Sequence, residues 1–331
     1  MQALSYDSQG PFQAFDQKAT SSSIPKTEWR NLEKKNNNQI IVDRQFRAYF
    51  PLFKSTLIRV PGEASYVPFS EIKDGSNISL AITSSPYEKH FGIFWKTIAH
   101  IANEKKSSEI AIVMICAQSQ QQSKDVGWDP YWSEGTLFLE DVSVKLDSQE
   151  STEHVIYRTF TLQCQNKTTT VKHYHFHMWL DGEYDIPSIV EYGPVFKKLT
   201  ECICPVVVHC RAGIFRSGIV SIALMTLKKL QVFNKSINEE VVDRHIWESL
   251  DALRHPETGR SYLMAPTKDN LLVARKIVYH VWNSMKSQSS DMQSFPQQIS
   301  AENNSLSSLR LWTLLIREQS AFLTIRVKRR F

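Results

Sequence analysis

The sequence VVVHCRAGIFRSG, residues 206–218, decides how the rest of this chain is interpreted. Its first part, Val206 to Val208, is an apolar run that predicts a buried strand, and the residues from Ser217 onward predict a helix. The loop between them leads into a helix N-terminus, where backbone N–H groups bind anions well. We therefore expect an anion-binding loop between a strand and a helix.

Two side chains of this stretch carry chemistry. The helix N-terminus and Arg216 both favour the thiolate form of Cys210, which makes it a nucleophile. The planar guanidinium of Arg216 offers paired donors that match two oxygens of a phosphate. A nucleophile, an anion-binding loop and a charged clamp within one stretch predict phosphoryl transfer through a phosphocysteine.

The stretch resembles the His-Cys-x-x-Gly-x-x-Arg-Ser signature of the protein tyrosine phosphatase family. The resemblance implies that Cys210 attacks the phosphate and Arg216 stabilises it, while His209 and Ser217 support the thiolate by hydrogen bonds. The residues that would surround the bound phosphate are Arg211, Ala212, Gly213, Ile214 and Phe215. Phe215 departs from the pattern, because tyrosine-specific members usually have Gly there and dual-specificity members tolerate other residues. Its ring could narrow access to the loop.

A second stretch, WLDGEYDIP at residues 179–187, resembles the mobile Trp-Pro-Asp loop of the family. The resemblance implies that Asp181 is the general acid that protonates the leaving tyrosyl oxygen. Leu180 replaces a Pro, which should loosen the loop. Because the loop is also two residues longer than in the family, the carboxyl group could come from Asp185 instead, although we favour Asp181.

Three further stretches resemble family segments with departures that weaken catalysis or peptide binding. In the segment at residues 43–51, Phe46 falls where an aromatic ring sandwiches the substrate phenol, and Ala48 replaces an Asp that clamps the peptide. The amide-rich loop at residues 118–124 lacks the Glu that pairs with the signature Arg. Residues 266–270 resemble Gln-Thr-x-Asp-Gln, where the Gln side chains position water. Pro266 cannot position water and Asn270 is one methylene shorter than Gln, so hydrolysis of the phosphocysteine is the step most at risk.

The composition is that of an ordinary globular protein, with 42% hydrophobic and 22% charged residues among 331. The net charge of +5 is small and dispersed, which argues against nucleic-acid binding. The five cysteines lack the spacing of a disulfide framework. Cys202 and Cys204 have no second ligand pair at zinc-like spacing. We expect neither a metal nor another cofactor.

The chain has no apolar signal core at its start and no window of ~20 apolar residues, which predicts a cytoplasmic protein without a transmembrane segment. Residues 1–25 predict a flexible leader, residues 26–285 the phosphatase domain, and residues 286–331 a linker with a basic tail. The tail could bind a membrane surface or a partner. A poorly ordered extension is at least as compatible with its sequence.

The resemblance covers roughly residues 40–285 and implies a single α/β domain, with a highly twisted mixed sheet flanked by helices. Alternating apolar and polar residues predict three antiparallel strands at 136–146, 154–164 and 169–179. In the last, His173, His175 and His177 share one face. They could hold a metal, but a His-Phe-His-Tyr pattern of the family accounts for two of them structurally.

Three functions remain compatible with the sequence. The first is a non-receptor type tyrosine phosphatase acting on phosphotyrosine-containing proteins. The second is an impaired pseudophosphatase that only binds phosphotyrosine, and the third is a dual-specificity or non-peptide phosphatase. The chain is also similar in overall style to divergent phosphatase-like proteins of polydnaviruses (bracoviruses), which would place it in a host-cell cytoplasm.

Overall fold

The computed structural model describes residues 9–25, 28, 31, 40–41, 50–63, 67–75, 78–121, 127–180, 189–232 and 237–302. Within these ranges only the backbone is described at residues 9–13, 40–41, 189 and 287–302. The chain divides into two units, residues 1–282 and residues 283–331.

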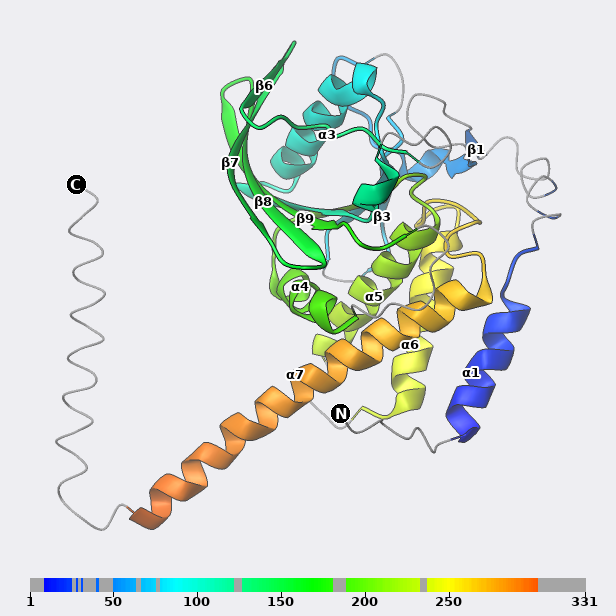
Figure 1. Cartoon of the computed structure of the whole chain (residues 1–331). Helices are drawn as coiled ribbons and strands as arrows, with labels where there is room; N and C mark the ends of the chain where they lie inside the picture. Colours follow the sequence, from blue (N-terminus) through cyan, green and yellow to red (C-terminus); the bar gives the residue numbers. More distant parts are fainter. Residues whose placement is uncertain are drawn as a thin grey trace. The chain divides into compact units, whose positions relative to one another are not determined.

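An eight-stranded sheet forms the centre of the first unit (Figure 1). Its strands are β3 (Ser70–Ile72), β4 (Leu80–Ser84), β5 (Glu109–Met114), β6 (Thr136–Leu139), β7 (Val142–Ser151), β8 (Val155–Cys164), β9 (Lys167–Phe176) and β10 (Val206–Cys210). Their spatial order is β3-β4-β10-β5-β9-β8-β7-β6. The four strands β4, β10, β5 and β9 run parallel, and the strands beyond them at both edges are antiparallel. The predicted mixed sheet of an α/β domain is confirmed.

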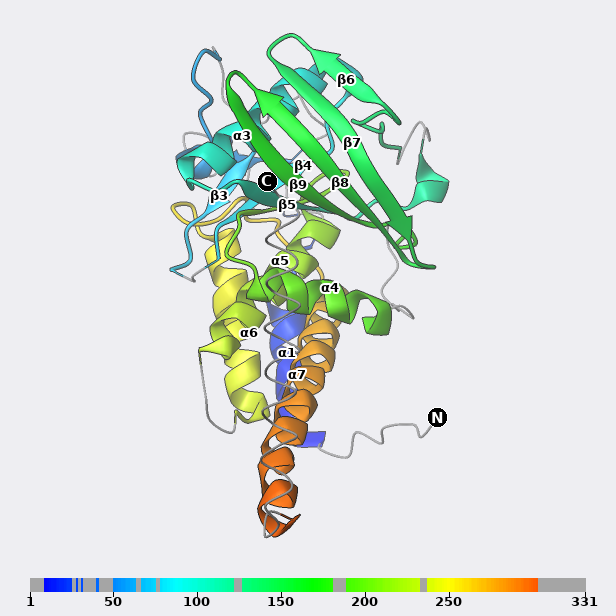
Figure 2. The same ribbon diagram turned by 90° about the vertical axis from the view of Figure 1, so that its left-hand side faces the viewer.

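Helices cover both faces of this sheet (Figure 2). Helix α3 (Phe91–Glu104) lies on one face, and α4 (Ile189–Glu201), α5 (Phe215–Gln231) and α6 (Glu239–Arg254) lie on the other side. Phe94 and Trp95 of α3 pack in one hydrophobic core with Val207 of the central strand β10. Val206 and Val208 are equally buried on the opposite face. The continuous apolar run therefore marks a strand covered on both faces, as is typical of parallel sheets.

Shorter elements complete the first unit. The strands β1 (Ile40–Ile41) and β2 (Leu52–Phe53) form a two-stranded sheet. Single 3₁₀ turns occur at η1 (Lys54–Thr56), η2 (Glu88–His90) and η3 (Gln118–Gln120).

The antiparallel part of the sheet differs from the prediction in its first strand. One strand was expected at residues 136–146, but the structure divides this segment into β6 and β7, with a turn at Glu140 and Asp141. The two strands pair with each other as a hairpin. Two consecutive carboxylates favour a solvent-exposed turn over a ladder position, which explains the break.

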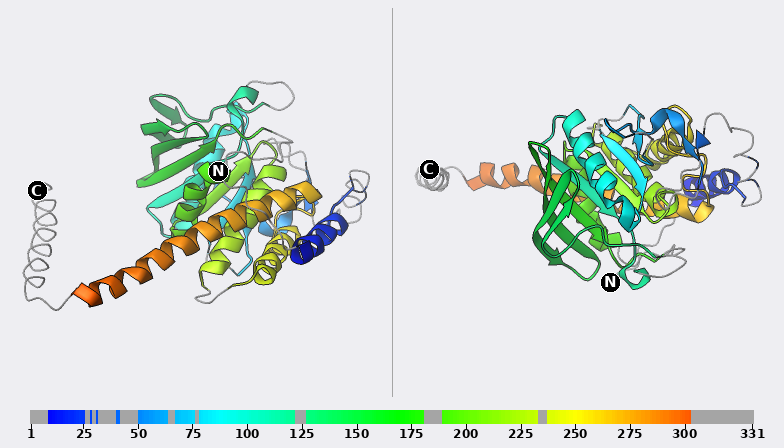
Figure 3. Two further views of the ribbon diagram at one scale, coloured as in Figure 1. Left: turned by 60° about the horizontal axis from the view of Figure 1, so that its bottom comes forward. Right: turned by 90° about the horizontal axis from the view of Figure 1, so that it is seen from above.

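The segment expected to be a flexible leader contains a docked helix, α1 (Gln9–Ser21). Figure 3 shows α1, in dark blue, beside α6. Phe15 and Ala19 are four residues apart, hence on one helix face, and both are buried. The Phe15 ring lies 4.7 Å from that of Trp247, and Arg254 donates to the Ser22 carbonyl. The leader prediction was wrong for residues 9–21, because an apolar pair within a polar stretch was overlooked.

The last helix is longer than the predicted one, which ended near Met285. Helix α7 spans Lys268–Glu302 and includes residues expected to form a linker. This continuation runs against local propensity, because residues 286–302 include Pro296, which is unfavourable inside a helix. No helix of the described residues is both long and apolar enough to cross a membrane. The predicted basic tail lies outside the described residues.

Candidate active site

The signature stretch begins at the C-terminal end of β10 and leads into α5. All five residues of β10 are buried, and the strand pairs in parallel with β4 on one side and β5 on the other. Residues 211–214 form the loop, and α5 begins at Phe215. The positive end of the helix dipole therefore adjoins the loop. The predicted succession of strand, loop and helix is confirmed.

The loop wraps around the Cys210 sulfur. Cys210 is 2% exposed, and its Sγ accepts a hydrogen bond from the Gly213 N–H over 3.3 Å. The Ser85 N–H donates to the carbonyls of both Cys210 and Arg211. Ser85 directly follows β4, and its hydrogen bonds keep these two carbonyl groups directed at its own N–H. The N–H groups of the loop can therefore point toward the sulfur, where an anion would bind.

Arg216 is buried on the first turn of α5. It is 4% exposed, and its Nη1 donates to the Trp179 carbonyl over 2.9 Å. Trp179 is buried and stacks on Tyr192. The guanidinium thus binds the first residue of the predicted acid loop. Asp181 and Asp185 lie outside the described residues, so the identity of the general acid stays a prediction.

A second arginine, Arg260, supports the loop from behind, and no sequence motif predicts this role. Arg260 is fully buried and donates to the carbonyls of Gly213, Pro68 and Ile82. Burial lowers its pKa to about 9, whereas the nearby Cys210 favours the charged guanidinium. Its three carbonyl partners come from three separate segments, so no local sequence motif predicts that Arg260 supports the loop.

His209 is buried beneath the loop and hydrogen-bonds away from the sulfur. Its Nδ1 lies 3.4 Å from the Cys210 carbonyl oxygen, and its Nε2 lies 2.7 Å from the Tyr131 hydroxyl. Burial lowers the pKa of His209 to about 4. A neutral imidazole therefore orients the Cys210 peptide group and adds no positive charge beside the thiol.

The histidines beneath the loop should make the fold sensitive to acid. Burial lowers the pKa of His209 to about 4, that of His175 to about 3 and that of His173 well below 6.5. The unfolded chain binds protons at these sites below about pH 6.5, whereas the folded chain does not. The free energy of unfolding should therefore fall as the pH drops from 6.5 toward 4, by up to about 1.4 kcal/mol per pH unit for each histidine.

Urea unfolding between pH 7.5 and pH 4.5 measures this dependence. His255→Gln provides a control substitution at a histidine that is exposed in a loop. A free energy of unfolding that stays constant or rises toward acid would contradict the neutral state of the buried histidines.

An aromatic contact that the sequence analysis does not predict lies beside the loop. The Phe215 ring, partly exposed, contacts the ring of Phe50 edge to face, with centroids 5.8 Å apart. Phe46, the predicted substrate aromatic, and Ala48 lie outside the described residues, so the role of Phe46 stays a prediction. Phe50 went unnoticed because its contact partner lies far along the chain.

Two other predicted residues have structural contacts of their own. The Asn270 amide oxygen accepts from the Thr267 N–H, and the Thr267 hydroxyl accepts from the Asn270 N–H. This is a reciprocal cap at the start of α7. The Ser217 hydroxyl is buried and has no hydrogen-bond partner among the described residues, so the structure does not contain the predicted bond to the Cys210 sulfur.

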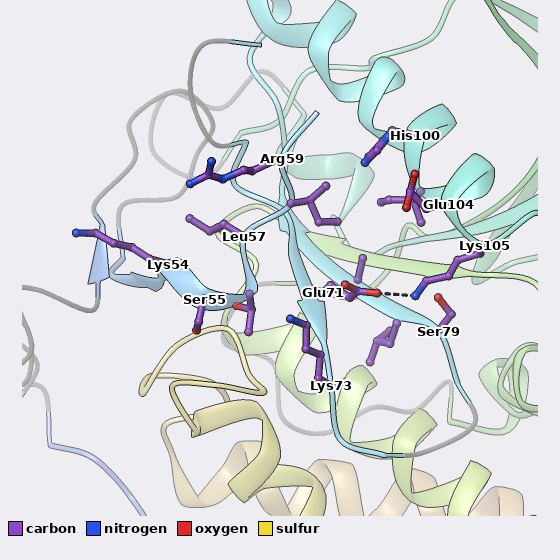
Figure 4. Close-up of a pocket in the computed structure, with 15 residues that line it drawn as sticks. Lys54, Ser55, Leu57, Arg59, Glu71, Lys73, Ser79, His100, Glu104 and Lys105 are labelled. Carbon is purple, nitrogen blue, oxygen red and sulfur yellow. Dashed lines mark hydrogen bonds and ion pairs between the residues drawn. The ribbon is translucent and has the colours of Figure 1, made fainter. Parts of the chain in front are cut away.

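A cavity of about 570 Å³ lies elsewhere, at the N-terminal end of β4 (Figure 4). Charges of both signs line it, including an ion pair between Glu71 and Lys105 with a distance of 2.6 Å. Cys210 pairs with Ser84 at the opposite end of β4. Of the predicted site residues that the structure describes, none lines this cavity.

Potential metal ligands within the described residues lie apart from the signature loop. Ligand atoms of Glu109, Cys202 and Cys204 are within 4.8 Å of one another. The two cysteines form a disulfide, which the sequence had not indicated, so their sulfurs are not thiolate ligands. His173 and His175, in turn, are hydrogen-bonded within the core.

Comparisons with known proteins agree with the signature. A family model described as "Protein-tyrosine phosphatase" matches residues 33–255. Receptor-type tyrosine-protein phosphatase N2 of Mus musculus is 27% identical over 196 residues, covering 56% of this chain and 19% of that protein. Tyrosine-protein phosphatase Lar-like of Caenorhabditis elegans is 26% identical over 214 residues, covering 62% of this chain and 9% of that protein.

A yeast relative matches a larger share of its own length. Tyrosine-protein phosphatase 3 of Schizosaccharomyces pombe is 20% identical over 209 residues, which cover 61% of this chain and 63% of that protein. This chain thus spans from 9% to 63% of the length of the three relatives. With the family model matching most of the described domain, the chain belongs to the protein-tyrosine phosphatase family.

Proposed function

We propose that this chain is a cysteine-dependent phosphatase that hydrolyses phosphotyrosine in proteins. One observation carries the proposal: the Cys210 sulfur accepts the Gly213 N–H inside a loop at the N-terminus of α5. Phosphate oxygens bind well to such a loop. Arg216, on the first helical turn, supplies a guanidinium that matches the geometry of two phosphate oxygens.

In the first half-reaction the Cys210 thiolate attacks phosphorus. An S–P bond forms, the P–O bond to tyrosine breaks, and a carboxylic acid, for which we propose Asp181, gives its proton to the leaving oxygen. Arg216 and the loop amides stabilise the charge on the remaining phosphate oxygens. These groups provide the positive charge, so the proposed reaction requires no metal.

In the second half-reaction water attacks the phosphocysteine. The Asp181 carboxylate takes a proton from water, the new P–O bond forms, and the S–P bond breaks to release inorganic phosphate and the thiolate. No covalent change remains on the protein. The proposed partners are phosphotyrosine-containing proteins, which are released with the tyrosine dephosphorylated.

The second candidate is a pseudophosphatase that binds phosphotyrosine without turning it over. The specific observation in its favour is the cap at α7, where the Asn270 amide oxygen is engaged by the Thr267 N–H. That oxygen is the group expected to orient the attacking water. Loss of water positioning would impair the second half-reaction and leave phosphate binding and the first half-reaction intact.

Rapid-mixing hydrolysis of a small aryl phosphate distinguishes the two candidates. We expect a burst of phenol release close to one equivalent, followed by slower steady turnover, because water activation is the weaker half of this site. Asn270→Gln, which adds one methylene, should leave the burst unchanged. If Asn270 serves only as a cap, the steady rate should stay unchanged as well.

Three outcomes separate the hypotheses. Steady turnover after the burst supports the phosphatase. A burst that stalls, with phosphate trapped on Cys210 in the mass spectrum, supports the impaired form. Absence of any phenol release, with a phosphotyrosyl peptide still bound, would overturn the catalytic proposal.

A further inference from the structure

We propose that Arg158 positions the Cys210 loop through a buried chain of hydrogen bonds whose direction it fixes. The chain consists, in order, of Arg158, His173, Tyr131, His209 and the carbonyl group of Cys210. It begins on β8, crosses β9 and ends at β10, beneath the proposed catalytic loop. Its role in catalysis rests on the proposed function, whereas its geometry does not.

The contacts of the chain are continuous. Arg158 Nη1 lies 3.5 Å from His173 Nδ1, and His173 Nε2 lies 2.9 Å from the Tyr131 hydroxyl oxygen. The same hydroxyl lies 2.7 Å from His209 Nε2. Tyr131 is fully buried, and Arg158 is only 7% exposed. Water therefore does not compete for these groups, and each proton has a defined partner.

The direction follows from the arginine end. A guanidinium can donate hydrogen bonds but cannot accept them, so the facing His173 Nδ1 carries no proton. Neutral His173 then has its proton on Nε2 and donates to the Tyr131 oxygen. The Tyr131 hydroxyl proton is thereby directed to His209 Nε2. A weaker alternative acceptor for it is the Met114 sulfur at 3.8 Å.

The opposite end requires the same direction. With its Nε2 accepting, neutral His209 carries its proton on Nδ1, which faces the Cys210 carbonyl oxygen at 3.4 Å. A carbonyl oxygen can only accept. A reversed chain would place the lone pair of Nδ1 against this oxygen. Donor-only and acceptor-only groups at the two ends thus select one arrangement of protons.

His175 provides an independent check of the arginine end. Its Nε2 lies 2.7 Å from the Cys116 carbonyl oxygen and must donate to it, which leaves Nδ1 without a proton. That Nδ1 faces the same Nη1 of Arg158 at 3.5 Å. Two histidines therefore present acceptors to one guanidinium, as a donor-only group requires.

Arg158 is itself held in place. Its Nε donates to Gln149 Oε1 over 2.7 Å, and its guanidinium lies over the Trp132 ring at 4.3 Å. Burial lowers its pKa to about 10, which leaves it charged at neutral pH. Burial also raises the pKa of Tyr131 well above 10.0, so that its hydroxyl keeps its proton. The fixed arginine therefore maintains the direction of the chain.

The end of the chain acts on the loop through a peptide group. The Cys210 carbonyl accepts from His209 Nδ1 and from the Ser85 N–H. Both bonds orient the peptide that leads into the loop, where the Gly213 N–H points at the sulfur. Reversal of the chain would repel this carbonyl and weaken the donor contact to the thiolate. Arg158 is in this sense a positioning residue, since it touches no reacting atom.

Three variants of the full chain test the proposal. Arg158→Met removes the donor, Arg158→Lys keeps a charged group that can only donate, and Arg244→Met is a matched control at an exposed arginine of α6. Nitrogen NMR of ¹⁵N-histidine-labelled protein identifies the protonated ring nitrogen. Alkylation of Cys210 by iodoacetamide, followed by mass spectrometry across a pH series, reports the thiolate without requiring turnover.

In the wild-type chain we expect protonation of Nε2 in His173 and His175 and of Nδ1 in His209. In Arg158→Met we expect His209 to be protonated partly on Nδ1 and partly on Nε2. The pH at which Cys210 becomes alkylated should also rise. The kcat/KM of this variant should fall about tenfold, the order that one lost hydrogen bond supports. Arg158→Lys and Arg244→Met should stay within about twofold of wild type, as expected when the hydrogen-bond direction is kept.

The outcomes separate this proposal from the proposed function. Protonation of Nε2 in wild-type His209 would overturn the proposed direction of the hydrogen bonds, whatever the catalytic activity. An unchanged His209 signature and alkylation profile in folded Arg158→Met would also overturn it. If Arg158→Met does not fold, failure of Arg158→Lys to keep the wild-type signature would do the same. If the protein shows the predicted histidine protonation but hydrolyses no phosphate ester, the proposed hydrogen-bond direction is supported and only the proposed phosphatase activity is overturned.

Discussion

Replacing Cys210 by serine should abolish the hydrolysis of an aryl phosphate, with a loss of roughly 10⁴-fold or more. A hydroxyl in this position keeps its proton at neutral pH and cannot replace a thiolate as the attacking group. The exchange of sulfur for oxygen keeps the shape of the side chain, so the buried loop should remain folded. Release of phenol and of inorganic phosphate, each followed separately, measures the effect.

Binding should survive this substitution. The Gly213 N–H, the loop amides and Arg216 remain, so a phosphotyrosyl peptide should bind with an affinity within about threefold of wild type. Cys164→Ser is the matched control, because Cys164 is a free cysteine on β8, far from the signature in sequence. It should keep full activity. Undiminished hydrolysis by Cys210→Ser would show that another group is the nucleophile.

The second large effect is expected for Gly213→Ala. Gly213 has φ +71°, and a Cβ at this position would overlap with the backbone carbonyl of Thr83 on β4. We expect the free energy of unfolding to fall by about 2–4 kcal/mol, from the left-handed backbone and the overlap together. Displacement of the N–H that faces Cys210 should lower kcat/KM by about 10²–10³-fold, as for a lost oxyanion donor.

Two other glycines separate the causes of this effect. Gly75 has φ +73° with open space around its Cβ position, so Gly75→Ala should cost only about 1 kcal/mol of stability and no activity. Gly92 lies in α3 with open space, and Gly92→Ala should be neutral or stabilising by up to about 1 kcal/mol. Equal losses for Gly213→Ala and Gly75→Ala would contradict the overlap with Thr83. Denaturant unfolding and steady-state kinetics measure both quantities.

Local sequence was most informative where structure depends on neighbours in the chain. The apolar run at Val206 predicted a buried strand, and the residues after the loop predicted a helix, because strand, loop and helix follow one another directly. It was less reliable where two turn residues interrupt an alternating pattern, as at Glu140 and Asp141. It also missed α1, whose burial depends on contact with Trp247.

The sequence alone therefore determined the family, the α/β class and the loop that presents Cys210 and Arg216. Only the tertiary structure identified Arg260 behind this loop and the direction of the chain from Arg158 to His209. Arg260 donates to Gly213, 47 residues away, and to Ile82, 178 residues away. The physical reason is that a buried polar group is stabilised by whichever partners folding brings to it. Such partners have no fixed spacing in sequence, and so no pattern predicts them.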